Sequence, residues 1–292
     1  MRLQRLLGAV LGTMLLAGLL AGCHLLGTPA PEKVVRIAVL PAYSLEVMAK
    51  RYAPFMDYLT RETGFRMEFV SSLSYGHYLG VVEDSGVDFG FQNPFVFQIL
   101  RKTRAAYPVA QVVGPGGSLV ERGVVVTRVD SDIREIAQLT GKRIMASSKL
   151  ALVGYLAQAS LLASAGVVPD RNVRIIRGGR QDELLVKLLL DRKADAAFVR
   201  EGALKTVEGS VDLSRIRIIG TTDFFPNWCL AAFPETDPTV VSKVQEAILK
   251  LTAENPEQAS ILEPMGAVRF VVPDPEQYRK VLDLVAALGV PL

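Results

Sequence analysis

Strand-like and helix-like segments alternate along most of the chain, and this alternation restricts the fold more than any other feature of the sequence. Short runs rich in Val, Ile and Phe begin at Val34, Phe65 and Val87. Between the first two lies a stretch, residues 45–64, with apolar side chains at helical spacing and a closing Gly64. Alternating strands and helices indicate βαβ units, so we expect an α/β protein with mostly parallel sheets flanked by helices.

The alternation runs through two cycles that share one plan. In residues 77–93 and again in residues 183–201, a helix leads through a charged turn and an aspartate to an apolar strand with a polar end. Asp88 in the first cycle corresponds to Asp195 in the second. Chance similarity is the alternative, because short helix–turn–strand units look alike. The pattern predicts two lobes built on one scheme.

The polar strand ends are the first candidate site. The run "GVDFGFQNP" reads as a buried strand that brings Gln92 and Asn93 to a sharp stop at Pro94, and Arg200 ends the comparable strand of the second cycle. Ligands of open α/β sheets bind beyond the carboxyl ends of the strands, and pockets are frequent between domains. We therefore interpret these side chains as contacts to a ligand or between lobes, with simple capping of the turn before Pro94 as the alternative.

The N-terminus has the pattern of an export signal. Arg2 and Arg5 precede an uncharged run, residues 6–20, which is too short for an easy bilayer span. The following "LAGC" resembles the bacterial lipobox, which implies cleavage before Cys23 and lipid on that residue. We expect residues 1–22 to be a lipoprotein signal peptide and residues 23–33 a tether, with an ordinary signal peptide as the alternative. The folded part would then lie outside the cytoplasm, lipid-anchored to a membrane.

The charge balance argues against nucleic acid as a partner. Without the two arginines of the leader, 31 basic residues face 30 acidic ones. Surfaces that bind nucleic acid normally show a basic excess. The charge balance therefore predicts no DNA or RNA partner.

The reactive side chains are too few for most enzyme or metal sites. If Cys23 is acylated, Cys229 is the one remaining thiol, and the histidines are His24 and His77. These residues cannot form an intramolecular disulfide, a cysteine-rich metal site or a histidine-based triad. The sequence also has no Gly-x-Ser-x-Gly motif and no phosphate-loop signature. We predict no catalytic residues, no metal and no cofactor.

Several segments resemble the periplasmic phosphate, phosphite and phosphonate-binding proteins of ABC importers, a branch of the type 2 solute-binding fold. The resemblance extends over roughly residues 34–254 and is carried by "YAPFMDYLTRETG", "SYGHYLGVVEDSGVDFGFQNPFVF", "DIREIAQLTGKRI", "GYLAQASLLASAGV" and "ADAAFV". It implies two lobes joined by two hinge strands, which we expect at residues 124–128 and near residues 220–230. The first lobe would comprise residues 34–124 and 229–292, and the second residues 125–228.

The resemblance also implies a ligand site between the lobes. Its positions, with Arg200 added from the strand-end pattern, are Tyr43, Ser44, Ser74, Tyr75, Gln92, Asn93, Ser147, Ser148, Arg180, Gln181 and Asp182. A helix is expected to begin after "GGRQD", so its N–H groups and the Arg180 guanidinium could grip an anion. For Arg180 the alternative is a solvated helix start, and for Asp182 a helix cap.

The sequence departs from the family at the ligand-gripping loops. Ala151, Leu152 and Val153 stand where phosphonate binders have hydroxyl residues, and residues 179–182 lack the family's histidine. A site without its hydrogen-bond donors leaves ligand oxygens unsatisfied, at about 1–3 kcal/mol for each buried group. The cargo is therefore left open between a phosphonate-like anion, another small anion and a different polar solute.

The function that follows is that of a solute receptor. We expect a monomer that closes its lobes over a small anionic ligand and passes it to an ABC transporter permease. A ligand-sensing subunit that serves a sensor kinase is the alternative, and an enzyme on this fold is the third possibility. Residues 131–141 are expected to form a capped helix at the start of the second cycle. In the tail, residues 237–258 and 281–290 are expected to be helices on the first lobe. Trp228 is expected in the core near the second hinge, with a cleft position as the alternative.

Overall fold

A computed structural model describes residues 33–84, 86–177 and 182–292. In these ranges no helix combines the length and apolar character that crossing a bilayer requires. The predicted signal peptide and tether, with Cys23, lie outside the described residues. Residues 34–292 form one compact unit.

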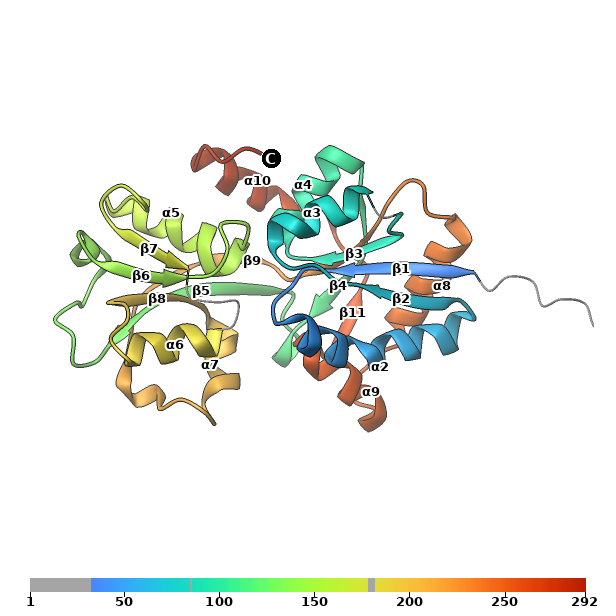
Figure 1. Cartoon of the computed structure of the whole chain (residues 1–292), viewed down its shortest axis with the longest axis horizontal. Helices are drawn as coiled ribbons and strands as arrows, with labels where there is room; N and C mark the ends of the chain where they lie inside the picture. Colours follow the sequence, from blue (N-terminus) through green and yellow to red (C-terminus); the bar gives the residue numbers. More distant parts are fainter. Residues whose placement is uncertain (1–32, 85, 178–181) are drawn as a thin grey trace, which may run out of the picture. The chain divides into compact units, whose positions relative to one another are not determined.

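The first of two sheets has six strands in the order β11-β4-β10-β3-β1-β2 (Figure 1). Strand β1 runs parallel to β2 and β3, whereas β10 is antiparallel to β3 and β4, and β11 is antiparallel to β4. The strands are β1 (Val34–Val39), β2 (Arg66–Val70), β3 (Phe89–Gln92), β4 (Tyr107–Val113), β10 (Cys229–Ala232) and β11 (Arg269–Val271).

Helices on both faces of this sheet complete the first lobe. The predicted helix of residues 45–64 is α2, and it ends at Gly64, which adopts a left-handed conformation and donates its N–H to the Thr60 carbonyl. Its buried side chains, Phe55 and Leu59 among them, share a core with sheet residues such as Ile37. The helices are α2 (Leu45–Thr63), α3 (Tyr75–Asp84), α4 (Pro94–Arg104), α8 (Pro238–Leu249) and α9 (Pro256–Leu262).

The second sheet has five strands in the order β7-β6-β8-β5-β9 and, with its helices, makes the second lobe. Strand β6 is parallel to β7 and β8, and β5 is antiparallel to β8 and β9. The elements are β5 (Val120–Arg128), β6 (Arg143–Ala146), β7 (Arg174–Arg177), β8 (Ala196–Arg200), β9 (Ile216–Pro226), α5 (Ala157–Ser164), α6 (Asp182–Leu190) and α7 (Glu201–Val207).

The expected two-lobed α/β architecture is confirmed, with two corrections. Each sheet is mixed rather than mostly parallel, because the strands next to the crossings between sheets run back against their neighbours. The helix expected at residues 131–141 is only a short 3-10 turn, Ile136–Leu139. The side chain of Gln138 bonds the N–H groups of Arg134 and Glu135 and holds this single turn.

The chain passes from the first sheet to the second at residues 114–119 and returns at residues 227–228. The first crossing precedes the expected hinge, since β5 pairs within the second sheet from Val120 onward. Asn227 ties the two crossings together, because its Nδ2 donates to the carbonyl of Ser118 at 2.9 Å and to that of Val112 at 3.2 Å. The division into lobes by residue range stays a prediction.

The single tryptophan, Trp228, follows the return crossing. It is partly buried and packs against the first-lobe core, with its ring centroid 5.6 Å from that of Phe91. Trp228 therefore has the core contacts that we expected of it.

The correspondence between Asp88 and Asp195 is confirmed in atomic detail. The Asp88 carboxylate accepts the N–H of Arg36 at 2.8 Å, and the N–H of Asp88 donates to the Arg36 carbonyl. The Asp195 carboxylate accepts the N–H of Arg143 at 2.8 Å, and the N–H of Asp195 donates to the Arg143 carbonyl. In each lobe the aspartate precedes a central strand and bonds the strand beside it. Asp88 thus joins the start of β3 to β1, and Asp195 joins the start of β8 to β6.

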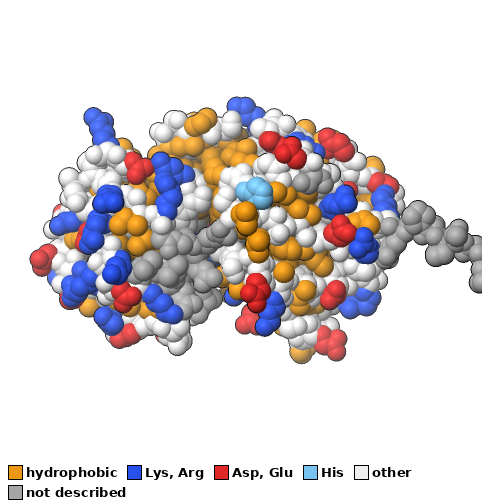
Figure 2. Space-filling model, in the orientation of Figure 1, with side chains coloured by type: hydrophobic (Ala, Val, Ile, Leu, Met, Phe, Trp, Pro, Cys, Tyr) orange, Lys and Arg blue, Asp and Glu red, His pale blue; other side chains and the backbone are white. Residues whose placement is uncertain are grey.

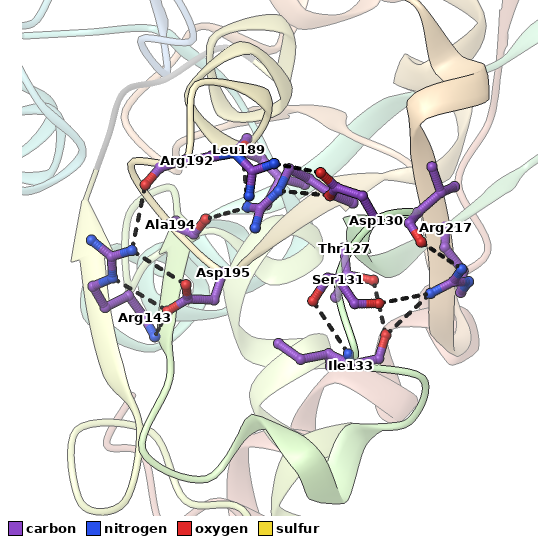
Figure 3. A network of polar contacts seen from close by, with 12 residues as sticks. Thr127, Asp130, Ser131, Ile133, Arg143, Leu189, Arg192, Ala194, Asp195 and Arg217 are labelled. Carbon is purple, nitrogen blue, oxygen red and sulfur yellow. Dashed lines mark hydrogen bonds and ion pairs between the residues drawn. The ribbon is translucent and has the colours of Figure 1, made fainter.

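In the second lobe this bond is part of a larger network (Figure 3). The Arg143 guanidinium also bonds both oxygens of Asp195, at 3.2 Å each. Close by, Asp130 pairs with Arg128 at 3.2 Å and with Arg192 at 2.5 Å. The network joins the end of β5, the end of α6 and the start of β6.

We expect Asp195→Asn to lower stability by about 1–2 kcal/mol at neutral pH, since hydrogen bonds to a charged group are lost. Burial raises the pKa of Asp195, but the side-chain and backbone hydrogen bonds from Arg143 outweigh it and hold the pKa below its usual range. A lowered carboxylate pKa stabilises the fold above the unfolded value of about 4 and ceases to do so as pH falls through the folded value.

Urea unfolding between pH 7 and pH 2 measures both effects. The wild type should lose more stability below pH 4 than the Asn variant loses. Asp57→Asn, at an exposed position of α2, is the control and should change stability by less than about 0.5 kcal/mol. Equal acid sensitivity of wild type and Asp195→Asn would contradict the prediction.

The two tail helices do not share one lobe. Helix α8 contributes Val240 and Val244 to the first-lobe core, as expected. In α10 (Arg279–Ala287), Val281 and Val285 instead belong to the cluster that fills the second lobe, so the expectation was wrong for this helix. Periodicity reveals that a helix has an apolar face, but not which sheet covers it.

Candidate functional site

The predicted site positions share one structural property, their place beyond strand ends. In the described part of the chain, they follow the carboxyl ends of β1, β2, β3, β6 and β7, or are the last residues of β3 and β8. Within each lobe these strand ends lie at the same edge of the sheet, because the strands are parallel neighbours: β1 pairs with β2 and β3, and β6 pairs with β8. The edge where ligands of open α/β sheets bind is therefore the edge that carries these residues.

Several of the predicted site residues affect the pKa of one buried side chain, Tyr52 in α2. Its ring is buried and stacks on Phe69 with the centroids 6.0 Å apart. Burial raises the pKa of the Tyr52 phenol, and the nearby Tyr43 and Tyr75 add to the rise, whereas Arg51 and Arg200 oppose it. Three predicted residues, Tyr43, Tyr75 and Arg200, thus act electrostatically on the same phenol.

These groups come from both sheets. Tyr43 follows β1 and Tyr75 begins α3 in the first lobe, and Arg200 ends β8 in the second. The guanidinium of Arg51 lies 3.9 Å from the centroid of the Tyr43 ring, a cation–π contact. The site therefore combines phenols from one lobe with positive charge from both.

Asn93 performs the two structural roles that the sequence left open. Its side-chain oxygen accepts the N–H groups of Phe95 and Val96 and caps α4. Its Nδ2 donates to the carbonyl of Leu150, in the loop after β6, at 3.0 Å. Asn93 is both a helix cap and a contact between the lobes.

The side-chain amide of Gln92 forms its hydrogen bonds with residues of the first lobe. Its side chain is fully buried, its oxygen accepts from the Tyr78 hydroxyl at 2.6 Å, and its nitrogen donates to the Cys229 carbonyl at 3.4 Å. A ligand contact by Gln92 stays a prediction, because the structure shows only the bonds that its amide makes within the protein. A buried amide that ends a strand must be satisfied, and here the protein itself satisfies it.

Ser147 and Ser148 are engaged within their own loop. The Ser147 hydroxyl donates to the Gly154 carbonyl at 3.3 Å, and the Ser148 hydroxyl accepts the N–H of Leu150 at 3.1 Å. The three residues that replace the family's hydroxyls, Ala151 to Val153, are all buried. The loop is consequently more apolar than the resemblance implied.

Gln158 of α5 holds this loop in place. Its side-chain oxygen accepts the N–H of Gly154 at 2.9 Å, and its nitrogen donates to the Val199 carbonyl at 3.1 Å. Gly154 has φ +115°, a conformation that side-chain-bearing residues rarely adopt. The N–H group at this helix start is thus bonded within the protein.

Ser74 and Ser44 lie at helix starts on the surface. The Ser74 hydroxyl accepts the N–H of His77, whose Nδ1 accepts the N–H of Leu73 at 3.0 Å. His77 is exposed. Figure 2 shows hydrophobic side chains gathered near the middle of the face that it draws. Ser44 is exposed at the N-terminus of α2 and makes no side-chain cap bond there.

The structure does not describe the side chains of three predicted site residues, Arg180, Gln181 and Asp182. Arg180 and Gln181 lie outside the described residues. Asp182 begins α6, but its side chain lies outside the described part as well.

Sequence reasoning missed Arg51, Tyr52 and Gln158. Tyr52 was read only as part of the apolar face of a helix, and its hydroxyl was the available signal that it could do more. Arg51 and Gln158 gave no signal, because their roles depend on residues far away in the sequence.

The acidic residue that follows β8 is paired with an arginine. Glu201 accepts two hydrogen bonds from Arg122, at 2.8 and 2.6 Å, and these bonds hold the pKa of Glu201 below its usual range. Among the described residues, no group of three His, Cys, Asp or Glu side chains is placed to hold a metal ion. The chemistry that the arrangement offers is recognition, with guanidinium groups and phenols suited to an anion.

We expect Cys229 to be unreactive in the folded protein. It is fully buried, and burial raises the pKa of its thiol to about 12, against the lowering effect of Tyr278 and Gln92. At pH 8 a thiol reagent should therefore react with a Cys23→Ser protein only after denaturant is added. Rapid labelling without denaturant would contradict this prediction.

A family model matches residues 37–278, and it describes periplasmic phosphonate substrate-binding proteins of ABC transporters. The tetrathionate sensor histidine kinase TtrS of Salmonella typhimurium is 28% identical over 201 residues, which cover 63% of this chain and 33% of the kinase. The phosphate-import protein PhnD of Mycolicibacterium smegmatis is 24% identical over 232 residues, with 74% of this chain and 70% of that protein covered. The chain thus spans about a third of the kinase.

Solved structures share the fold. A binding protein of an ABC phosphonate transporter from Pseudomonas aeruginosa superposes with a TM-score of 0.79 at 16% identity, covering 88% of this chain and 87% of that one. PhnD1 of Prochlorococcus marinus, solved with methylphosphonate, gives a TM-score of 0.76 at 15% identity, with 88% and 98% covered.

Proposed function

This chain belongs to the family of periplasmic phosphonate-binding proteins of ABC transporters, and we propose that it is a lipid-anchored receptor that delivers a small anionic solute to an ABC importer. The solute binds between the lobes, at the strand ends, and the monomeric receptor closes on it by bending at the two crossings. The permease then takes the solute from the closed form.

One observation carries this proposal: Tyr43 and Tyr75 from the first lobe and Arg200 from the second all act electrostatically on the Tyr52 phenol. A guanidinium at a strand end can form charge-assisted hydrogen bonds with ligand oxygens, and phenols can supplement them. Binding there would involve both lobes at once, which is how a ligand stabilises a closed form.

A sensory role is the second candidate. The match to a tetrathionate sensor kinase favours it, as does the replacement of the hydroxyl loop by Ala151 to Val153. In that role the closed receptor would contact a sensor kinase instead of a permease. Crosslinking in native membranes, followed by mass spectrometry, distinguishes the two partners.

The lipid anchor is a proposal of its own. It rests on the basic start, the uncharged run and the "LAGC" sequence before Cys23. Metabolic labelling with a fatty-acid analogue should mark the wild type but not Cys23→Ser, and the variant should leave the membrane fraction. Equal labelling of both proteins would overturn this part.

A melting screen tests the ligand. The Cys23→Ser protein is heated with phosphate, phosphite, methylphosphonate, sulfate, tetrathionate and neutral amino acids. A ligand at 100 times its dissociation constant stabilises by about 2.7 kcal/mol, which raises the melting midpoint by about 5 °C or more in a domain of this size. We expect such a rise with at least one anion and with none of the neutral compounds.

Arg200→Met serves as the site variant in this screen. Loss of a charge-assisted hydrogen bond should weaken binding about tenfold or more. Arg174→Met, at an exposed arginine of β7, is the matched control and should bind like the wild type. A response to neutral compounds only, or equal binding by Arg200→Met, would contradict the proposed site.

A further inference from the structure

Helix α10 begins from an anchor in the first lobe. Tyr278, just before the helix, is fully buried in that lobe, and its ring centroid lies 4.9 Å from that of Phe97 in α4. The side chain of Gln98 donates to the Tyr278 carbonyl at 3.3 Å. One residue earlier, the side-chain oxygen of Gln277 accepts from Gln111 of β4 at 3.2 Å.

The apolar face of α10 packs on the second lobe. Val281 is 0% exposed and Val285 is 3% exposed, and both share a cluster with Phe225 of β9. The Lys280 ammonium lies 3.5 Å from an Asp223 oxygen and 5.4 Å from the centroid of the Phe225 ring. In Figure 1 the helix lies beside α4 and α5, which belong to different lobes.

Helix α4 of the first lobe also contacts the cluster on which α10 packs. Its Phe95 is buried in the cluster of the second lobe, and Ile99 packs against that cluster. Further along α4, the Lys102 ammonium donates to the carbonyl of the final residue, Leu292, at 3.1 Å. Both ends of the segment from Tyr278 to Leu292 are therefore bonded to the first lobe, and its middle is packed on the second.

This arrangement has a mechanical consequence. Besides the two crossings, the segment from Tyr278 to α10 is therefore a further connection between the lobes. When the lobes change their angle, α10 must either give up buried contacts on one side or resist the change. Packed apolar contacts resist because partial separation loses dispersion contacts without admitting water.

We propose that α10 is a strap that restricts the range of angles between the lobes in the ligand-free protein. This goes beyond the proposed function, since it concerns the empty protein and requires neither a particular ligand nor a particular partner. A restricted range means that less conformational freedom is lost when a ligand fixes the closed form.

The test measures the distribution of distances between the lobes without ligand. Cysteines introduced at exposed Asp57 in α2 and exposed Lys193 in the second lobe carry spin labels for pulsed electron paramagnetic resonance. Cys23→Ser removes the other accessible thiol, and buried Cys229 stays unlabelled. The measurement therefore reports the angle between the lobes and not the position of α10 itself.

Val281→Asp/Val285→Asp places two carboxylates in the cluster and should release α10. We expect the distance distribution to become at least twofold wider, while hydrogen exchange in β3 and β8 stays slow. The matched control is Ala286→Asp, which adds the same side chain at an exposed position of the helix and should leave the width unchanged.

A second variant covers the case in which the double variant does not fold. Lys280→Glu reverses the charge beside Asp223 without placing a carboxylate inside the cluster and should widen the distribution by a smaller but measurable amount. Widths equal to the wild type in the folded double variant overturn the proposal. If the double variant does not fold, an unchanged width in Lys280→Glu does so.

Discussion

Gly123→Ala is expected to destabilise the protein by about 2–5 kcal/mol, an overpacking cost combined with the loss of buried hydrogen bonds. A Cβ at residue 123 would lie 2.1 Å from Nε2 of Gln158 and 2.4 Å from its Cδ. Gln158 cannot move aside freely, because it is fully buried and bonded to Gly154 and Val199. The new methyl group must break these bonds or shift β5.

Gly80→Ala is the matched control. Gly80 lies within α3, and a Cβ there would meet no atom within 4 Å. Alanine in a helix interior is more favourable than glycine by about 0.5–1 kcal/mol, so this variant should be slightly more stable than the wild type. Urea unfolding followed by circular dichroism measures both variants, and a stability loss below about 1 kcal/mol in Gly123→Ala would show that the Gln158 contacts are easily rearranged.

Asn93→Ala is expected to cost about 2–4 kcal/mol, because one side chain has two roles. Loss of the cap on α4, which leaves the N–H groups of Phe95 and Val96 without their acceptor, costs about 1 kcal/mol, and the Leu150 carbonyl left unsatisfied costs about 1–3 kcal/mol more. The contact with Leu150 also joins the lobes. Ligand affinity should therefore fall together with stability.

Asn93→Asp separates the two roles. Aspartate keeps an oxygen for the cap but loses the amide nitrogen that donates to the Leu150 carbonyl. We expect it to recover the cap and not the contact between lobes, so that its stability lies between those of wild type and Asn93→Ala. Equal stability of the Asp and Ala variants would show that the cap contributes nothing measurable.

The polar residues at the strand ends show how a sequence can predict a position while it leaves several roles open for the side chain. The alternation of apolar runs and polar stops in the sequence marked Gln92, Asn93 and Arg200. Only Arg200 lies near the Tyr52 cluster, whereas Gln92 turns inward to Tyr78 and Asn93 caps a helix and bonds Leu150. The spacing of residues along a strand predicts where the strand ends. It does not predict which neighbouring groups the polar side chain at that end will bond.

Local patterns in the sequence were sufficient to predict the α/β class, the two cycles and the equivalence of Asp88 and Asp195, because periodicity and turn residues are local properties. Tertiary contacts were needed to establish that the sheets are mixed, that α10 packs on the second lobe, and that Arg51 and Tyr52 accompany the predicted site residues. Each of these features depends on contacts between residues distant in the chain. Such contacts depend on which apolar surfaces pack together. A sequence contains many segments of similar hydrophobicity, so it does not reveal which two of them will pack.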